Sequence, residues 1–150
     1  MRGGIVNSDV KEIKKVVSSM HMGNLLFKSY INRTEDEKLK KELMKVLDRF
    51  EAHVNKYKMV CQKYHIENID KLNFRQEVSL NIQLMKQYKN DFGIISDALK
   101  GLNMGTLGML DFIYKNKNIN NEIKEYSKEV LKDYDILKER LHKFSLETYC

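Results

Sequence analysis

Apolar residues recur three and four positions apart in four long segments of the chain, which is the spacing of one side of an α-helix. The pattern predicts helices from about Ser8 to Ile31, from the cap at Thr34 to about Tyr64, from about Asp91 to Ile113, and roughly over residues 120–146. The sequence contains no proline, so no proline interrupts these segments. The apolar stripes comprise Val10, Ile13, Val17, Met20, Phe27 and Ile31; Leu43, Phe50, Tyr57 and Tyr64; Phe92, Ile95, Leu99, Leu102, Thr106, Met109 and Ile113; and Ile123, Tyr126, Val130, Tyr134, Leu137, Leu141 and Phe144.

The lengths of the connections predict how these helices are arranged. Short turns join the first helix to the second and the third to the fourth, so each pair should form an antiparallel hairpin. The connection over residues 65–90 is much longer, and Val78, Ile82 and Met85 lie in it at helical spacing, so we expect a short helix there. Two hairpins joined by one long crossover are typical of a ferritin-like four-helix bundle. We therefore predict a single all-α domain over residues 1–150, with a flexible N-terminus at residues 1–7.

Composition narrows the class of protein. The chain has 150 residues, of which 42% are hydrophobic and 32% charged, as in an ordinary globular domain. Its formal charge is +6, but the lysines alternate with acids along the helices, which is typical of solvated helix faces. We therefore expect no nucleic-acid partner. There is no run of about 18 apolar residues and no hydrophobic leader, so we expect no membrane span and a cytoplasmic protein. The two cysteines are too few for a disulfide scaffold.

Two segments carry a resemblance to a known family. "EDEKLKKELMKVLDRFEAHVNKY", residues 35–57, is similar to the second helix of small bacterial rubrerythrin-related domains of unknown function, which belong to the ferritin-like superfamily. "ISDALKGLNMGTLGMLDFIY", residues 95–114, resembles their third helix. The resemblance covers roughly residues 8–146, and it implies a ferritin-like fold and a bacterial source. It also implies the place of a di-metal site built from two Glu-x-x-His motifs and two further glutamates.

The metal ligands that the resemblance implies are missing. His53 corresponds to the family's histidine, but Phe50 stands three residues before it where a glutamate is needed. Glu51 is only two residues from His53, so the two side chains point about 200° apart on a helix. In the first helix Gly23 and Asn24 occupy the zone of the family's glutamate, and in the third helix Leu102 does. We therefore expect a degenerate site with no metal, no cofactor and no catalytic residue.

Mildly polar side chains nevertheless lie on the inward stripes. One interpretation is that they satisfy one another's hydrogen bonds, and the other is that they surround a small cavity for a ligand or a single metal ion. Gly101, Gly105 and Gly108 lie beside this zone and leave room for a neighbouring backbone, an aromatic ring or a ligand. The candidate cluster comprises Asn24, Tyr30, His53, Tyr57, Thr106, Tyr126 and Tyr134.

These features favour a non-catalytic, structural or protein-binding bundle that forms a homodimer or binds a protein partner. The resemblance suggests a role of the spore-coat or stress-related kind. Two alternatives stay open. The first is a di-iron or di-manganese carboxylate protein acting as an oxidase, peroxide scavenger or iron handler, with ligands supplied across a dimer. The second is weak binding to nucleic acid or an anionic surface through the positive charge.

Overall fold

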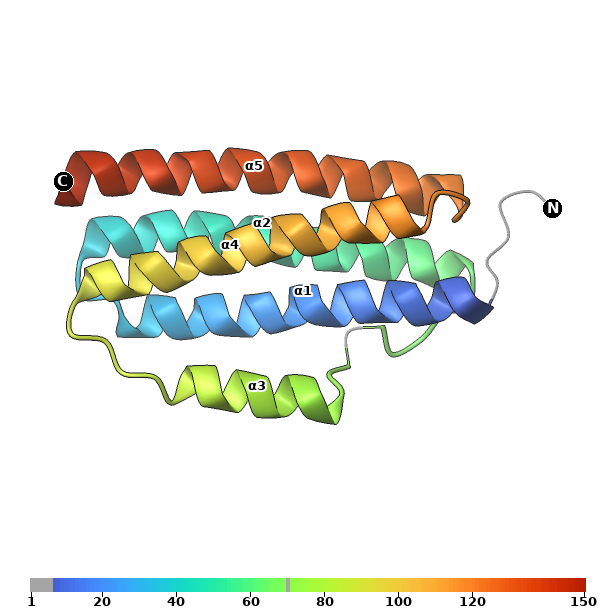
Figure 1. Ribbon diagram of the computed structural model, residues 1–150, viewed down its shortest axis with the longest axis horizontal. Coiled ribbons are helices and arrows are strands. Elements are labelled where there is room, and N and C mark those ends of the chain that lie inside the picture. The colour runs from blue at the N-terminus through green and yellow to red at the C-terminus, as the bar shows by residue number, and fades with distance from the viewer. Residues whose placement is uncertain (1–6, 70) are drawn as a thin grey trace.

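The computed structural model describes residues 7–69 and 71–150, and this part of the chain forms five α-helices and no strand (Figure 1). The helices are α1 (Asn7–Arg33), α2 (Glu37–Lys63), α3 (Phe74–Leu84), α4 (Asp91–Lys115) and α5 (Asn121–Tyr149). The all-α prediction, the four long helices and the short helix in the crossover are thus confirmed. Of the N-terminal segment predicted to be flexible, residues 1–6 lie outside the described residues. Asn7, the last residue of the predicted segment, is instead the first residue of α1.

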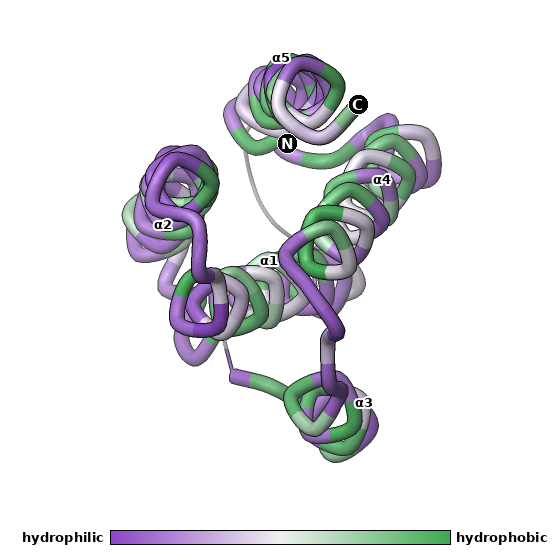
Figure 2. The backbone as a smooth tube through the Cα atoms, turned by 90° about the vertical axis from the view of Figure 1, so that its left-hand side faces the viewer, coloured by the Kyte–Doolittle hydropathy of each residue, from purple (hydrophilic) through white to green (hydrophobic). Residues whose placement is uncertain are grey.

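The four long helices lie alongside one another, with α3 outside them. In end view α1 and α5 are diagonally opposite, as are α2 and α4 (Figure 2). The pairs in contact are α1 with α2, α4 with α5, α1 with α4, and α2 with α5, whereas α3 packs on α1. The chain runs one way along α1 and α5 and the opposite way along α2 and α4 (Figure 1). Every neighbouring pair of long helices is therefore antiparallel.

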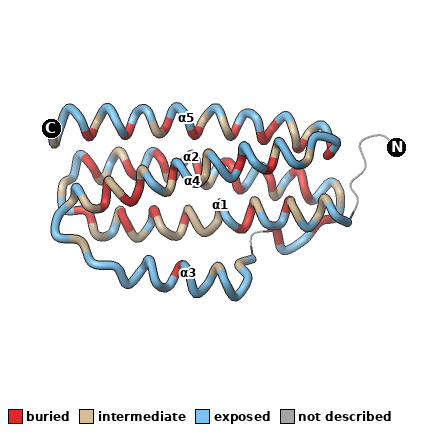
Figure 3. The backbone as a smooth tube through the Cα atoms, in the orientation of Figure 1, coloured by how far each residue is buried: buried red, intermediate tan, exposed pale blue. Residues whose placement is uncertain are grey.

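The predicted apolar stripes meet in one core between the long helices. Ile13, Leu43, Leu102 and Ile123 are among its fully buried members. Phe92 is an exception, since half of its surface is exposed at the start of α4. Each long helix buries one side and exposes the other, so burial alternates along each of them (Figure 3). None of the described helices is long and apolar enough to cross a membrane.

The crossover helix α3 turns its apolar stripe away from the core. Its only buried residue is Leu80, which packs inward beside a hydrogen bond from Gln76 Nε2 to Ser18 Oγ of 3.0 Å. Val78 and Ile82 are each two residues from Leu80 and therefore lie on the opposite side, about 200° away. They are exposed, and α3 is almost entirely exposed in Figure 3. The apolar spacing thus predicted the helix correctly, but it marks the outer side of α3.

Short polar side chains begin the helices. Thr34 does not cap α2 as predicted, because its hydroxyl donates to the carbonyl of Tyr30. Asp36 takes that place and accepts from the Lys38 amide at 2.8 Å. The carboxylate of Asp91 accepts from the amides of Glu35 and Asp36, at 3.1 and 2.8 Å, and so joins the first turn of α4 to the α1–α2 turn.

A second set of polar contacts fixes the end of the crossover. Arg33 donates to the carbonyls of Leu84, at 2.7 Å, and Lys86. Asp97 lies off the apolar stripe of α4, yet it is buried. It forms an ion pair with Lys86 at 2.8 Å and accepts from the Tyr88 hydroxyl at 2.7 Å. Both partners come from the crossover, which covers this carboxylate.

Candidate functional site

His53 occupies the centre of the α2–α5 interface. Its Nδ1 lies 2.7 Å from the Tyr126 hydroxyl oxygen, and its Nε2 lies 2.5 Å from Oδ2 of Asp133. An ionised carboxylate only accepts hydrogen bonds, so the Nε2–H donates to Asp133 and Nδ1 accepts from Tyr126. The sequence predicted that His53 and Tyr126 lie inward, and the structure joins them directly.

Asp133 joins this group, although it was not among the predicted site residues. Besides His53, it accepts from Arg49 Nε at 3.0 Å, so one carboxylate oxygen serves a buried imidazole and a half-exposed guanidinium. Asp133 sits on the flank of the stripe of α5, next to Tyr134. It follows Tyr126 by seven residues, which is two helical turns and brings both onto the same side of α5. That spacing was the available signal.

Burial sets the ionisation of this group. It lowers the pKa of the His53 imidazole below 6.5, and the hydrogen bond to Asp133 only partly opposes that effect. Burial also raises the pKa of the Tyr126 hydroxyl to about 12. At neutral pH the imidazole and the phenol of this group are therefore both neutral. Its hydrogen bonds are complete without a ligand.

Tyr57 forms a second polar contact one turn further along α2. Its side chain is fully buried, and its hydroxyl is hydrogen-bonded to Ser127 Oγ, which in turn donates to the carbonyl of Ile123 at 2.7 Å. The ring of Tyr57 packs edge-on against that of Tyr126, with centroids 5.0 Å apart. Ser127 was not among the predicted residues, although it follows the stripe residue Ile123 by four.

The other predicted residues do not join this network. Thr106 donates to the carbonyl of Leu102 on its own helix at 2.8 Å and is only partly buried. Tyr30 packs against Phe27 at the other end of the molecule. Asn24 is buried, and its Oδ1 has no hydrogen-bond partner. The predicted cluster is therefore several separate groups along the core.

Tyr134 contributes its ring to the network but not its hydroxyl. The ring packs edge-on against Phe50 and His53, with centroids 5.5 and 6.2 Å apart. The residue is buried, which raises the pKa of its hydroxyl. Within the described residues, no hydrogen bond reaches this hydroxyl.

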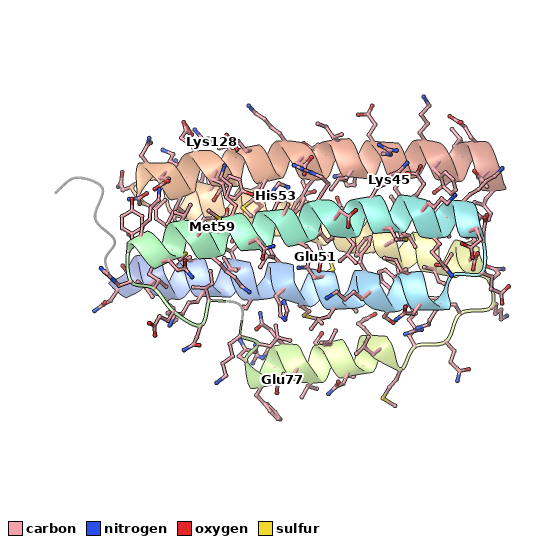
Figure 4. All side chains as sticks on the ribbon, turned by 180° about the vertical axis from the view of Figure 1, so that it is seen from behind. Lys45, Glu51, His53, Met59, Glu77 and Lys128 are labelled. Carbon is pink, nitrogen blue, oxygen red and sulfur yellow. The ribbon has the colours of Figure 1, made fainter. Side chains whose placement is uncertain are left out.

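Glu51 and His53 point to different sides of α2, as the helical geometry predicted. Glu51 is paired with Lys28 of α1 at 3.5 Å on the surface, whereas His53 faces α5 (Figure 4). In the part of the chain that the structure describes, no three His, Cys, Asp or Glu side chains come together as metal ligands would. Cys61 is buried, which raises the pKa of its thiol to about 11.

A cavity of about 380 Å³ lies on the other side of the core, between α1 and α4. Its walls are mostly apolar, and they include Gly23 of α1 and three glycines of α4, Gly101, Gly105 and Gly108. Tyr134 reaches it from α5. The sequence predicted that Gly101, Gly105 and Gly108 make room for a neighbouring backbone, an aromatic ring or a ligand, and all three lie on this cavity.

No protein-family model matches the chain, and no curated protein or solved structure matches it. The function is therefore inferred from the geometry.

Proposed function

We propose that this protein is a non-catalytic, ferritin-like four-helix bundle that acts by associating with a second copy of itself. The order and direction of the helices support the fold. The hairpins α1–α2 and α4–α5 are joined by residues 64–90, which return the chain to the end where α2 began (Figure 1). This is the connection of ferritin-like bundles. A structural role of the spore-coat or stress-related kind would fit such a protein.

The pairing of the core polar groups supports the absence of catalysis. A metal-binding histidine needs a free ring nitrogen, but both nitrogens of His53 are hydrogen-bonded within the chain. The nearest carboxylate, Asp133, is shared between His53 and Arg49. Residues that complete one another in this way stabilise the interior, because an unpaired buried polar group is costly.

The outer side of α3 is the observation that carries the proposed association. Phe74, Val78, Ile82 and Met85 recur at helical spacing, and we call them the α3 strip. Their exposed fractions run from 42% for Val78 to 80% for Phe74. Contiguous exposed apolar residues of this kind usually mark an interaction site. A short helix with a single apolar strip suits pairing with the same strip of a second chain.

Sedimentation analysis of the purified chain tests the association. We expect a dimer, and we expect Ile82→Lys to shift it to a monomer because the lysine would place a charge in an apolar contact. Ile136→Lys is the matched control: Ile136 on α5 is 61% exposed against 62% for Ile82, but it lies outside the α3 strip. A monomeric wild type, or equal behaviour of the two variants, would contradict the proposal.

Elemental analysis of the protein, purified without chelator, tests the absence of catalysis separately. We expect no stoichiometric iron or manganese and no acceleration of Fe(II) oxidation. Two bound metal ions per chain would favour the di-metal alternative instead, whatever the oligomeric state.

A further inference from the structure

The cavity between α1 and α4 has features that packing within the chain does not explain. A Cβ atom on Gly105 would lie 3.3 Å from Cε2 of Tyr134, so that glycine makes room for the tyrosine ring. A Cβ atom on Gly101 or Gly108 would meet nothing within 4 Å. Glycine is a poorer helix former than alanine, yet these two positions retain it and keep the wall of the cavity open.

The hydroxyl of Tyr134 is a second, independent feature. Tyr134 of α5 lines the cavity, and its ring atoms Cδ2, Cε2 and Cζ lie beside Gly105 of α4. Tyr134 is 5% exposed, and within the described residues its hydroxyl has no hydrogen-bond partner. Because no group of the described chain pairs with this hydroxyl, an oxygen atom on a bound molecule would supply an acceptor for it.

Charge and size restrict what the cavity would hold. The charged residues that line it are Glu12, Lys15, Asp111 and Lys115, two of each sign. All four lie at the end formed by the start of α1 and the end of α4, away from Tyr134. An ionised group next to Tyr134 would lose its hydration without meeting a counter-charge. A volume of about 380 Å³ is near the lower end of small-molecule pockets, which run from about 300 to 1,000 Å³.

We propose that the α1–α4 cavity binds a slender, neutral, lipid-like molecule: an unbranched alkyl chain bearing one alcohol, ketone or ester oxygen. The alkyl chain lies along the glycine backbone and the methionine side chains of the cavity, and its oxygen accepts a hydrogen bond from Tyr134. This site is separate from the α3 strip and does not depend on the proposed self-association.

Calorimetric titration of the full chain with octan-1-ol tests the proposal. We expect saturable binding of one molecule per chain, and weaker binding of octanoate because its charge must be desolvated. Tyr134→Phe retains the ring and should weaken octan-1-ol binding about fivefold, the effect of one neutral hydrogen bond. Failure of octan-1-ol to saturate, tighter binding of octanoate, or unchanged affinity in Tyr134→Phe would each overturn the assignment.

Filling the cavity provides a second test that does not endanger the fold. Gly108→Leu adds a side chain where a Cβ meets open space, so it should fold and reduce octan-1-ol affinity at least tenfold. Asn103→Leu adds the same side chain at an exposed position of α4 that does not line the cavity, and it should bind like the wild type. Gly101→Leu repeats the test at the other open glycine. Unchanged binding in both glycine variants would overturn the proposal, as would a loss of the dimer in them, since a second copy would then occupy the groove.

Discussion

The two long sides of this helical core are built on different principles. Between α2 and α5, polar groups complete one another: His53 with Tyr126 and Asp133, and Tyr57 with Ser127. Between α1 and α4, small and apolar residues leave a cavity of about 380 Å³. Hydrogen bonds require fixed distances and directions, so these contacts fix the positions of α2 and α5 relative to each other. Glycines impose no such geometry, and a cavity remains between α1 and α4.

The largest expected effect on stability comes from a substitution at the α2–α5 interface. Tyr57→Ala removes a fully buried ring and its bond to Ser127, and it should reduce the free energy of unfolding by about 3–5 kcal/mol. Met20→Ala, on the cavity side, should cost less, about 2 kcal/mol, because its side chain already borders empty space. Urea unfolding measures both. Equal costs for the two variants would remove the contrast between the sides.

The next largest effect on stability is expected from removing the Asp133 carboxylate at the α2–α5 interface. Asp133→Ala leaves the Nε2–H of His53 buried without an acceptor, and it should destabilise the protein by about 2 kcal/mol. Asp135→Ala removes a neighbouring, exposed carboxylate whose nearest cation, Lys138, is 3.8 Å away, and the free energy of unfolding should barely change. If thermal unfolding shows both variants at wild-type stability, the His53 group does not hold the α2–α5 interface together.

These residues also show how far the sequence could be interpreted. The spacing of apolar residues predicted all five helices, because a helix of this length must bury one side along its whole course. It could not tell which side of α3 is buried, since one inward residue, Leu80, and its neighbour Gln76 decide that through contacts with α1. Among the helices that the structure describes, only α3 turns its apolar stripe outward.

The candidate site was predictable only in part, for a related reason. His53, Tyr57 and Tyr126 lie in the centre of their stripes, so their burial follows from helical geometry. Asp133 lies on a flank, where a carboxylate usually reaches solvent. Its role depends on the distance between α2 and α5, which periodicity within one helix cannot supply.

A gain in stability is expected from substituting a glycine that lines the α1–α4 cavity. Gly108→Ala should raise the free energy of unfolding by about 1 kcal/mol, because alanine is the better helix former and its Cβ meets open space. Gly105→Ala should gain less or nothing, since its Cβ would lie 3.3 Å from the Tyr134 ring. Chemical denaturation of the two single variants distinguishes a glycine that leaves space from one that accommodates a neighbour. The reverse ranking would mean that the cavity is filled in solution.

The smallest effect is the pH dependence of stability that His53 introduces at the α2–α5 interface. Burial holds the pKa of His53 in the folded protein below the ordinary value of 6.5 that it regains on unfolding. Below about pH 6.5 the unfolded chain therefore binds more protons than the folded one, and the free energy of unfolding decreases as the pH falls. Above that pH this histidine contributes no slope. Denaturation curves recorded from about pH 7.5 to pH 5 should show the decrease in the wild type and in a variant of the exposed His142, His142→Gln, and a smaller one in His53→Gln. An identical slope in His53→Gln would show that another group titrates here, and the neutral imidazole between Tyr126 and Asp133 would lose its support.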